Sequence, residues 1–199
     1  MPVQVRAEET RERIVLAARA CFAEHGYTAT GTAEICRHAG LSKGAFYHHF
    51  PTKQAVFLAL LDRWLADLDA QLAAARAGAA SVPDGLRAMA AGAAPFFRDD
   101  DGQIALILEF WSQAARDPQV RQAALAPYHR YRDEIAALIR AGQAEGSLGA
   151  GDPQAAAHAI VSLAMGVLLQ SRLDPGGVDW GQAAQAGLDV ILAGLGGKR

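Results

Sequence analysis

Apolar residues recur at helical spacing along nearly the whole chain, and no segment alternates apolar and polar positions in the way a strand requires. Near the start, an apolar stripe predicts a first helix, with Thr10 as its N-cap and Gly26 as its C-terminal stop. The stripe follows the i, i+3, i+4, i+7, i+8 pattern and consists of Ile14, Ala17, Ala18, Cys21 and Phe22. One face of this helix should therefore lie in a core.

A second, shorter helix is predicted from Thr32 to His38, with Gly40 permitting a tight turn after it. Gly31 stands where a Ser or Thr N-cap opposite Glu34 would be usual, and glycine is a tolerable N-cap. The inward-facing positions are expected to be Ala33, Ile35, Cys36 and Ala39.

A third helix should begin at Ser42, whose hydroxyl can accept a hydrogen bond from a free backbone N–H. Leu41 and Phe46 occupy the two positions of a hydrophobic staple. Phe46 and Phe50 are four residues apart and should share a buried face. The opposite face then carries Lys43, Tyr47 and His48.

Pro51 ends the third helix, and Thr52 can cap a fourth. The apolar positions of the fourth helix are Val56, Ala59, Leu60, Trp64, Leu68 and Leu72. Further helices are predicted over residues 84–97, 103–116, 118–144, 153–173 and 181–195. The apolar run 159–169 is too short to span a membrane and is interpreted as a buried helix. The fold class is therefore all-α.

Two short helices about a tight turn, the second with an exposed polar face, form the layout of a helix-turn-helix. The stretch resembles the DNA-binding motif of the tetracycline-repressor (TetR) family. In that motif Ala-Gly-hydrophobic-Ser-Lys-Gly precedes Tyr-x-x-Phe and a Lys. Here these elements are Ala39 to Gly44, Tyr47 to Phe50 and Lys53, and the resemblance covers about residues 10–60. It implies a helix-turn-helix DNA-binding domain over residues 1–54 and a helical effector-binding and dimerisation domain over residues 55–199.

The resemblance also implies roles for individual residues. Thr32, Ser42, Tyr47 and Lys53 match phosphate ligands, and Lys43, Gly44, Ala45 and His48 match positions near base edges. Physical chemistry supports this division, because hydroxyls, cations and helix N-termini are common phosphate ligands. The expected partner is a palindromic double-stranded operator, which takes two copies of the chain to read.

Charge and composition qualify this interpretation. With 199 residues and 51% hydrophobic content the chain can bury a sizeable core. Its net charge of −2 would argue against nucleic-acid binding. Up to Lys53, however, seven Lys or Arg residues face five Glu, whereas the remainder has twelve basic and sixteen acidic residues. The amino-terminal excess is small but has the sign that a DNA-binding face requires. Cys21 and Cys36 are expected to be buried free thiols.

The carboxy-terminal part is expected to bind an effector and to dimerise. Helices 153–173 and 181–195 carry more apolar residues than one buried face needs, so we expect a homodimer through these last two helices. A cavity for a small, mostly apolar effector would draw on aromatic and polar residues of the middle helices. The candidate ligand-binding residues are Phe97, Glu109, Phe110, Trp111, Gln113, Tyr128, His129 and Arg132.

Other classes of protein fit the sequence less well. A helical enzyme is disfavoured because the chain has no nucleophile elbow, phosphate-binding glycine loop or zinc-type cluster. A helical adaptor that binds protein through the motif remains an alternative. Adjacent His48 and His49 point about 100° apart on a helix, so a metal site is not expected, and no cofactor is expected either. No charged-then-apolar leader opens the chain, which predicts a cytoplasmic protein without a membrane segment.

Overall fold

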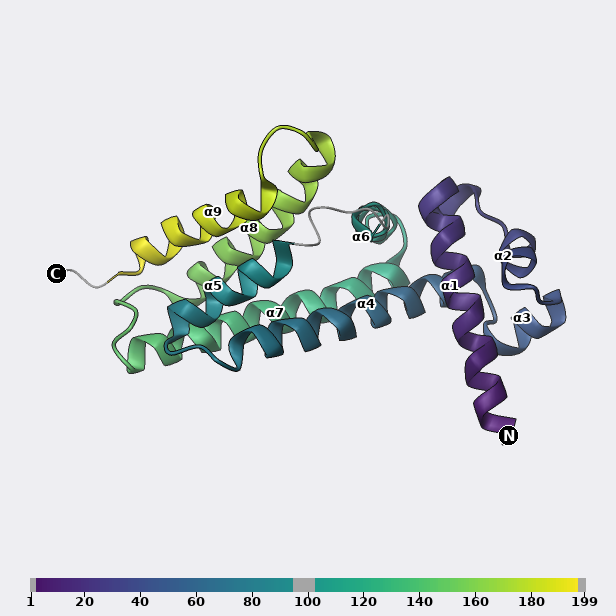
Figure 1. Ribbon diagram of the computed structural model, residues 1–199, viewed down its shortest axis with the longest axis horizontal. Helices are drawn as coiled ribbons and strands as arrows, with labels where there is room; N and C mark the ends of the chain where they lie inside the picture. Colours follow the sequence, from purple (N-terminus) through teal and green to yellow (C-terminus); the bar gives the residue numbers. More distant parts are fainter. Residues whose placement is uncertain (1–2, 95–102, 197–199) are drawn as a thin grey trace. The chain divides into compact units, whose positions relative to one another are not determined.

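The computed structural model describes residues 3–94 and 103–196, and within these ranges every regular element is a helix (Figure 1). The all-α prediction is confirmed. The helices are α1 Val3–Ala29, α2 Thr32–Ala39, α3 Lys43–His49, α4 Lys53–Arg76, α5 Val82–Ala93, α6 Gln103–Ala114, α7 Pro118–Ala144, α8 Pro153–Leu173 and α9 Trp180–Gly194.

Helix α1 begins earlier than its sequence signals suggested. Thr10 lies inside the helix, and its hydroxyl donates to the carbonyl of Arg6 at 2.8 Å, so the prediction that Thr10 is the N-cap is wrong. A threonine hydroxyl can bond back to the preceding turn, and the residue is then accepted within a helix. Gly26 interrupts the helix with φ 78° and ψ 161°, which confirms the predicted stop, although one further helical turn follows.

The helices pack as two compact units whose sequences interleave. The first unit contains the described residues within 1–66 and 101–123, and the second contains those within 67–100 and 124–199. Helix α6 thus packs with the amino-terminal helices, and it contacts α1. The predicted domain boundary between residues 54 and 55 stays a prediction.

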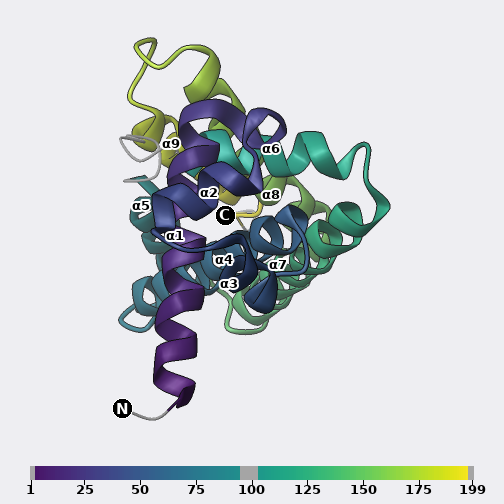
Figure 2. The same cartoon turned by 90° about the vertical axis from the view of Figure 1, so that its right-hand side faces the viewer.

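The core of the first unit joins α1, α2, α3, α4 and α6. In Figures 1 and 2, α2 and α3 lie on the same side of α1. Ile14, Ile35, Phe46 and Phe57 are completely buried there. The apolar stripes of the sequence predicted this for the first three. Ala33 is an exception: it was expected to face inward but is exposed, since it lies on the side of α2 away from this core.

In the second unit, α9 packs against both α5 and α8. The side chains of Asp152 and Asp179 cap the N-termini of α8 and α9 by accepting from Gln154 N and Gln182 N. Helices α8 and α9 approach closely where Gly187 faces Leu163. A Cβ added to Gly187 would lie 2.7 Å from Leu163 Cδ1, which is shorter than a normal van der Waals contact.

Helix α8 is less buried than its apolar sequence predicted. Its length and composition would suffice to cross a membrane, as do those of core helices in soluble proteins, and 22% of its apolar window is buried in the chain. Leu169 and Leu173 are 45% and 75% exposed. The interpretation of residues 159–169 as a buried helix is therefore wrong for the single chain, because only one side of α8 is covered.

Candidate nucleic-acid interface

The turn between α2 and α3 is fixed by backbone geometry and by one distant arginine. Gly40 has φ 63° and ψ 41°, the left-handed conformation that glycine adopts at least cost. Its N–H donates to the carbonyl of Arg37, and that of Leu41 donates to the carbonyl of Cys36 at 2.9 Å. From α1, Arg13 Nη2 donates to the carbonyl of Ala39 at 2.6 Å. These bonds satisfy the C-terminal carbonyls of α2 and set the direction in which α3 departs.

Helix α3 is held at both ends. Ser42 Oγ accepts from Ala45 N at 3.1 Å, as the sequence predicted for an N-cap. Phe46 is fully buried and Phe50 is 3% exposed, so the inward face of this seven-residue helix is fixed by aromatic packing. Lys43, Gly44 and His48 are exposed and Ala45 is half-buried. The predicted exposure of Lys43, Tyr47 and His48 is confirmed.

Two hydroxyl groups meet at the edge of this exposed face. Thr32 Oγ1 at the start of α2 lies 3.3 Å from Tyr47 OH, and Tyr47 is 50% exposed. Either hydroxyl can donate to the other, and whichever accepts keeps its own hydrogen free. The pair can therefore donate one hydrogen bond to an anion outside the protein while each side chain is held by the other.

Lys53, the first residue of α4, is engaged within the protein. Its Nζ donates to the carbonyl of Tyr27 at 2.6 Å and to that of Thr30 at 2.8 Å, and lies 4.3 Å from the centre of the Tyr27 ring. Burial lowers the pKa of Lys53, partly offset by the carboxylate of Glu109. Two of its three N–H donors are thus used by backbone carbonyls.

Sequence reasoning missed Arg13 and Tyr27, which support this surface from α1. Arg13 bonds a carbonyl 26 residues away, so no local pattern could have revealed it. The ring of Tyr27 packs against that of Phe57 in a tilted arrangement, with ring centres 4.3 Å apart. The only sequence feature that pointed to Tyr27 was an aromatic residue placed directly after the helix-breaking Gly26.

The cysteines and histidines near the motif show no metal-site arrangement. Cys21 and Cys36 are buried free thiols, as expected, and burial raises the pKa of Cys21. Cys21 Sγ lies 3.4 Å from His38 Nδ1. Across residues 3–94 and 103–196, no group of three or more His, Cys, Asp or Glu side chains could hold a metal ion.

The predicted ligand-binding residues fall into different compact units. Glu109, Phe110, Trp111 and Gln113 lie on α6 in the first unit, whereas Tyr128, His129 and Arg132 lie on α7 in the second; Phe97 is outside the described residues. The ring of Phe110 stacks on Phe57 with centres 3.8 Å apart, and its 4% exposure marks it as part of the first unit's core. Tyr128 OH lies 3.1 Å from His158 Nε2.

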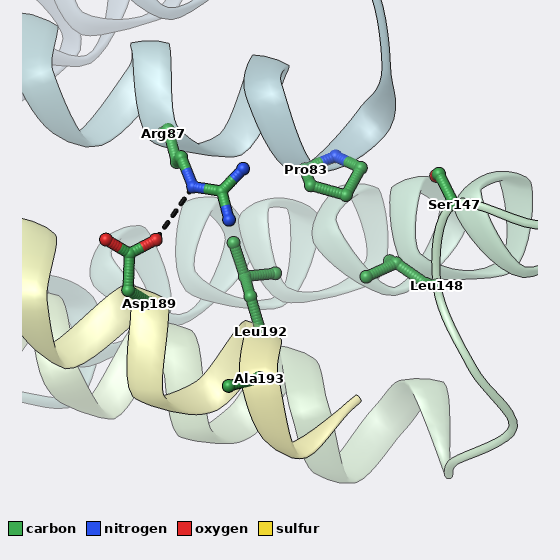
Figure 3. A pocket seen from close by; sticks show the side chains of 7 residues that line it. All are labelled: Pro83, Arg87, Ser147, Leu148, Asp189, Leu192 and Ala193. Carbon is green, nitrogen blue, oxygen red and sulfur yellow. Dashed lines mark hydrogen bonds and ion pairs between the residues drawn. The ribbon is translucent and has the colours of Figure 1, made fainter. Parts of the chain in front are cut away.

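A pocket of about 430 Å³ opens between α5, α9 and the loop after α7 (Figure 3). Arg87 Nε donates to Asp189 Oδ1 at 2.7 Å on one side of the pocket, facing Leu192 from α9. Its lining residues are Pro83, Arg87, Ser147, Leu148, Asp189, Leu192 and Ala193. These differ from all eight residues that the sequence suggested for an effector.

Two family profiles match the chain. The profile described as "Bacterial regulatory proteins, tetR family" matches residues 14–60, which contain the turn and the exposed face described above. The profile described as "BetI-type transcriptional repressor, C-terminal" matches residues 82–196. Together they cover both the helix-turn-helix and most of the remaining helices.

Individual proteins show the same likeness. The HTH-type transcriptional regulator UidR of Escherichia coli K12 is 29% identical over 146 residues, which are 73% of this chain and 72% of UidR. The structure of Salmonella enterica GusR is 31% identical with a TM-score of 0.73, covering 93% of this chain and 96% of GusR. The structure named "SmeT-Triclosan complex" is 27% identical with a TM-score of 0.81, covering 94% of this chain and 91% of SmeT.

Proposed function

Because this chain belongs to the TetR family of transcriptional regulators, which bind DNA and are not enzymes, we propose that it represses transcription as a homodimer on a palindromic operator and that a small molecule releases it. Its place of action is then the cytoplasm, where the DNA lies. The observation that carries the proposal is the exposure of one face of α3 while its other face is packed in the core. The opposite face carries Phe46 and Phe50, which are buried in the core, so the exposed face is not needed for packing.

We propose that the contacts to DNA divide by chemistry. Ser42 donates its hydroxyl hydrogen to a phosphate along the groove edge, and the Thr32–Tyr47 pair donates the one hydroxyl hydrogen that its mutual bond leaves free. Ser42 can do this while it caps α3, because its oxygen accepts from Ala45 N and its hydrogen stays free. Lys43, Ala45 and His48 reach base edges, and Gly44 lets the backbone of α3 approach the groove.

Dimerisation is supported by the uncovered apolar surface of α8 and α9. Leu169, Leu173 and Val190 are 45%, 75% and 74% exposed, although they lie on two of the most apolar helices. Burying such residues in a subunit interface gains about 25 cal/mol for each Å² of apolar surface removed from water. Two copies could place their α3 helices about 34 Å apart, one turn of DNA, as a palindrome requires.

We propose that a small organic effector releases the protein from DNA. The neighbouring SmeT structure is named as a complex with triclosan, which supports a small organic effector for this chain as well. The residues predicted to bind it stay candidates, and Phe110 among them is 4% exposed in the core of the first unit. An effector that favours the non-binding conformation by a few kcal/mol would suffice.

The experiment is selection of binding duplexes from a random-sequence pool by the full-length protein, followed by gel-shift titration. We expect a palindromic consensus, two chains per duplex, and an affinity that falls steeply as the salt concentration rises. Recovery of no duplex at low salt would contradict the proposal and favour the adaptor alternative. A reporter gene downstream of the selected sequence distinguishes repression from activation.

The hydroxyl of Tyr47 gives a sharper test on the selected duplex. Tyr47→Phe removes only the oxygen, so the half-exposed ring and the aromatic contact with Phe46 stay in place. We expect affinity to fall about tenfold on every duplex sequence, with the unfolding temperature unchanged within about 1 °C. Equal affinity of the two proteins would refute a phosphate contact by Tyr47.

A further inference from the structure

Helix α1 projects past the helices that pack on it. Within residues 5–29, Ile14 is the first buried residue of α1, so the core does not need the turns before it. Figures 1 and 2 show the amino-terminal end of α1 extending beyond both α2 and α3. Because the helix begins at Val3 and not at Thr10, about two further turns of regular helix stand beside α3.

Two arginines of α1 show where α3 crosses it. Arg13 donates to the carbonyl of Ala39, which precedes α3, at 2.6 Å. The guanidinium carbon of Arg11 lies 5.1 Å from the centre of the Phe50 ring, which follows α3. Residues 11–13 of α1 therefore lie alongside the two ends of α3, and the turns before them continue past it.

Arg6 lies in the projecting turns, on the side of α1 that faces α2 and α3. Arg6 and Arg13 are seven residues apart, which places them on one helix face and about 10 Å apart along the axis. Arg13 reaches the turn before α3 from this face. Helical side chains lean toward the helix N-terminus, so the side chain of Arg6 extends further past α3. Arg6 is exposed, and its guanidinium has no partner among residues 3–94 and 103–196.

The acidic residues of the same turns leave this face largely positive. Glu12 is paired with an arginine of α4, and Glu8 lies 3.9 Å from Arg11. Successive helix residues are about 100° apart, so Glu8 and Glu12 lie about 160° and about 120° around the helix from Arg6. Glu9, about 60° away, is the acidic residue of these turns that comes nearest to it.

We propose that Arg6 binds a phosphate of the DNA backbone beside the groove that α3 occupies. This inference rests on the proposed function, since it requires α3 to enter a major groove. That groove is about 12 Å wide, so its bordering backbones lie about 6 Å or more from a helix at its centre. Turns that continue about 10 Å past α3, with the reach of an arginine added, cover this distance. A guanidinium can donate two parallel N–H bonds to phosphate oxygens, which makes it well suited to this contact.

Arg6 adds α1 to the helices that contact the duplex. The hydroxyl groups proposed above as phosphate ligands lie on α2 and α3. The family resemblance adds Lys53 at the start of α4, whose ammonium keeps one N–H free beside its two carbonyl bonds. The sequence signals placed Arg6 before the first helix, so only the structure brings it to the side of α3.

Arg6→Gln removes the charge, and Arg140→Gln on α7 of the second unit is the matched control. Both arginines are exposed in helices, and glutamine keeps a high helix propensity at either position. For Arg6→Gln we expect the slope of log K against log salt on the selected duplex to shrink by about 0.9 for each chain, or about 1.8 for the dimer. At about 0.1 M salt this corresponds to a fall in affinity of at least about tenfold, on every duplex sequence alike. Arg140→Gln should leave the slope unchanged, and both unfolding temperatures should stay within about 2 °C of the wild type.

Duplexes in which single phosphates are replaced by uncharged methylphosphonates locate the contact. One replacement in each half of the palindrome should weaken binding of the wild type and leave that of Arg6→Gln unchanged, because the variant has already lost the contact. Arg6→Lys keeps the charge but cannot make two parallel bonds. It should therefore retain the salt slope of the wild type with a smaller loss of affinity than Arg6→Gln.

An unchanged slope in Arg6→Gln, or the lack of any phosphate whose effect depends on Arg6, would overturn the inference. A changed consensus in duplexes selected with Arg6→Gln would also overturn it, because this would show contact with bases. Recovery of no duplex by the wild type removes the proposed function and the inference together. A wild type that binds its duplex with the same slope as Arg6→Gln removes the inference alone.

Discussion

Gly44→Ala is expected to stabilise the protein and to weaken DNA binding at the same time. Gly44 is exposed in the first turn of α3 and has no positive φ. A Cβ built there would meet Ser42 Oγ at 3.8 Å, an ordinary van der Waals distance. The folded chain can therefore accept alanine without strain. Alanine also restricts the unfolded chain, so we expect a gain of about 0.5 kcal/mol, which raises the unfolding temperature by about 1–2 °C.

The loss in binding follows from the place proposed for Gly44 at the groove. An added methyl group would hold the backbone of α3 away from the base edges and phosphates that its neighbours contact. The loss of a single hydrogen bond of about 1.4 kcal/mol lowers affinity tenfold, and each subunit of a dimer would lose it once. We therefore expect at least a tenfold loss on the selected duplex, opposite in sign to the change in stability.

Gly92→Ala in α5 is the matched control. Gly92 is also exposed in a helix, and its added Cβ would meet Ala75 Cβ at 3.7 Å. Denaturant unfolding should show a similar small gain for both variants, whereas gel-shift titration should show a loss for Gly44→Ala alone. Unchanged affinity in Gly44→Ala would refute close approach of α3 to DNA. A marked loss of stability would refute the packing argument.

Two further predictions concern the second unit. Burial raises the pKa of Asp69, but hydrogen bonds from Tyr131 at 2.6 Å and from Arg130 lower it by more, so the net pKa lies below its usual value. A depressed carboxyl pKa stabilises the fold above the unfolded value of about 3.9 and loses that effect as pH falls through the folded value. Asp69→Asn should therefore lower the unfolding temperature by a few degrees at pH 7, which corresponds to about 1 kcal/mol for these partly exposed bonds. The difference in unfolding temperature between the variant and the wild type should narrow below about pH 4. A difference that does not depend on pH would contradict this. Leu169→Glu on α8 should dissociate the dimer in analytical ultracentrifugation. Leu125→Glu on α7 should leave the dimer intact, although the two leucines are similarly exposed, at 45% and 43%. Equal behaviour of the two variants would count against the α8 interface.

The helix-turn-helix could be predicted because its determinants are local. The turn needs a residue that tolerates positive φ, and Gly40 supplies it; the next helix needs a hydroxyl cap, and Ser42 supplies it. The burial of Phe46 and Phe50 follows from their four-residue spacing. The same local reasoning failed at Thr10, because a threonine can cap a helix or bond back within one and the sequence pattern is the same in both cases.

The supporting contacts of the candidate site could not be predicted. The carbonyls that Lys53 binds lie 26 and 23 residues earlier in the chain, so their meeting depends on how α1 and α4 pack. The family resemblance implied that Lys53 contacts a phosphate, and no pattern in the sequence indicated the bonds that its ammonium makes within the protein. The sequence was ambiguous about Phe110 as well, because an aromatic residue on an apolar helix can line a ligand cavity or fill a core. In the structure Phe110 stacks on Phe57.

By itself the sequence determined where helices form and which of their faces are apolar, because backbone propensity, capping and periodicity act within a few residues. Only the tertiary structure decided what covers each face. It placed α6 in the first compact unit and left much of α8 uncovered within the single chain. Packing brings together segments far apart in sequence, and the hydrophobic effect that drives it depends on buried area and has no direction, so an apolar stripe cannot name its partner.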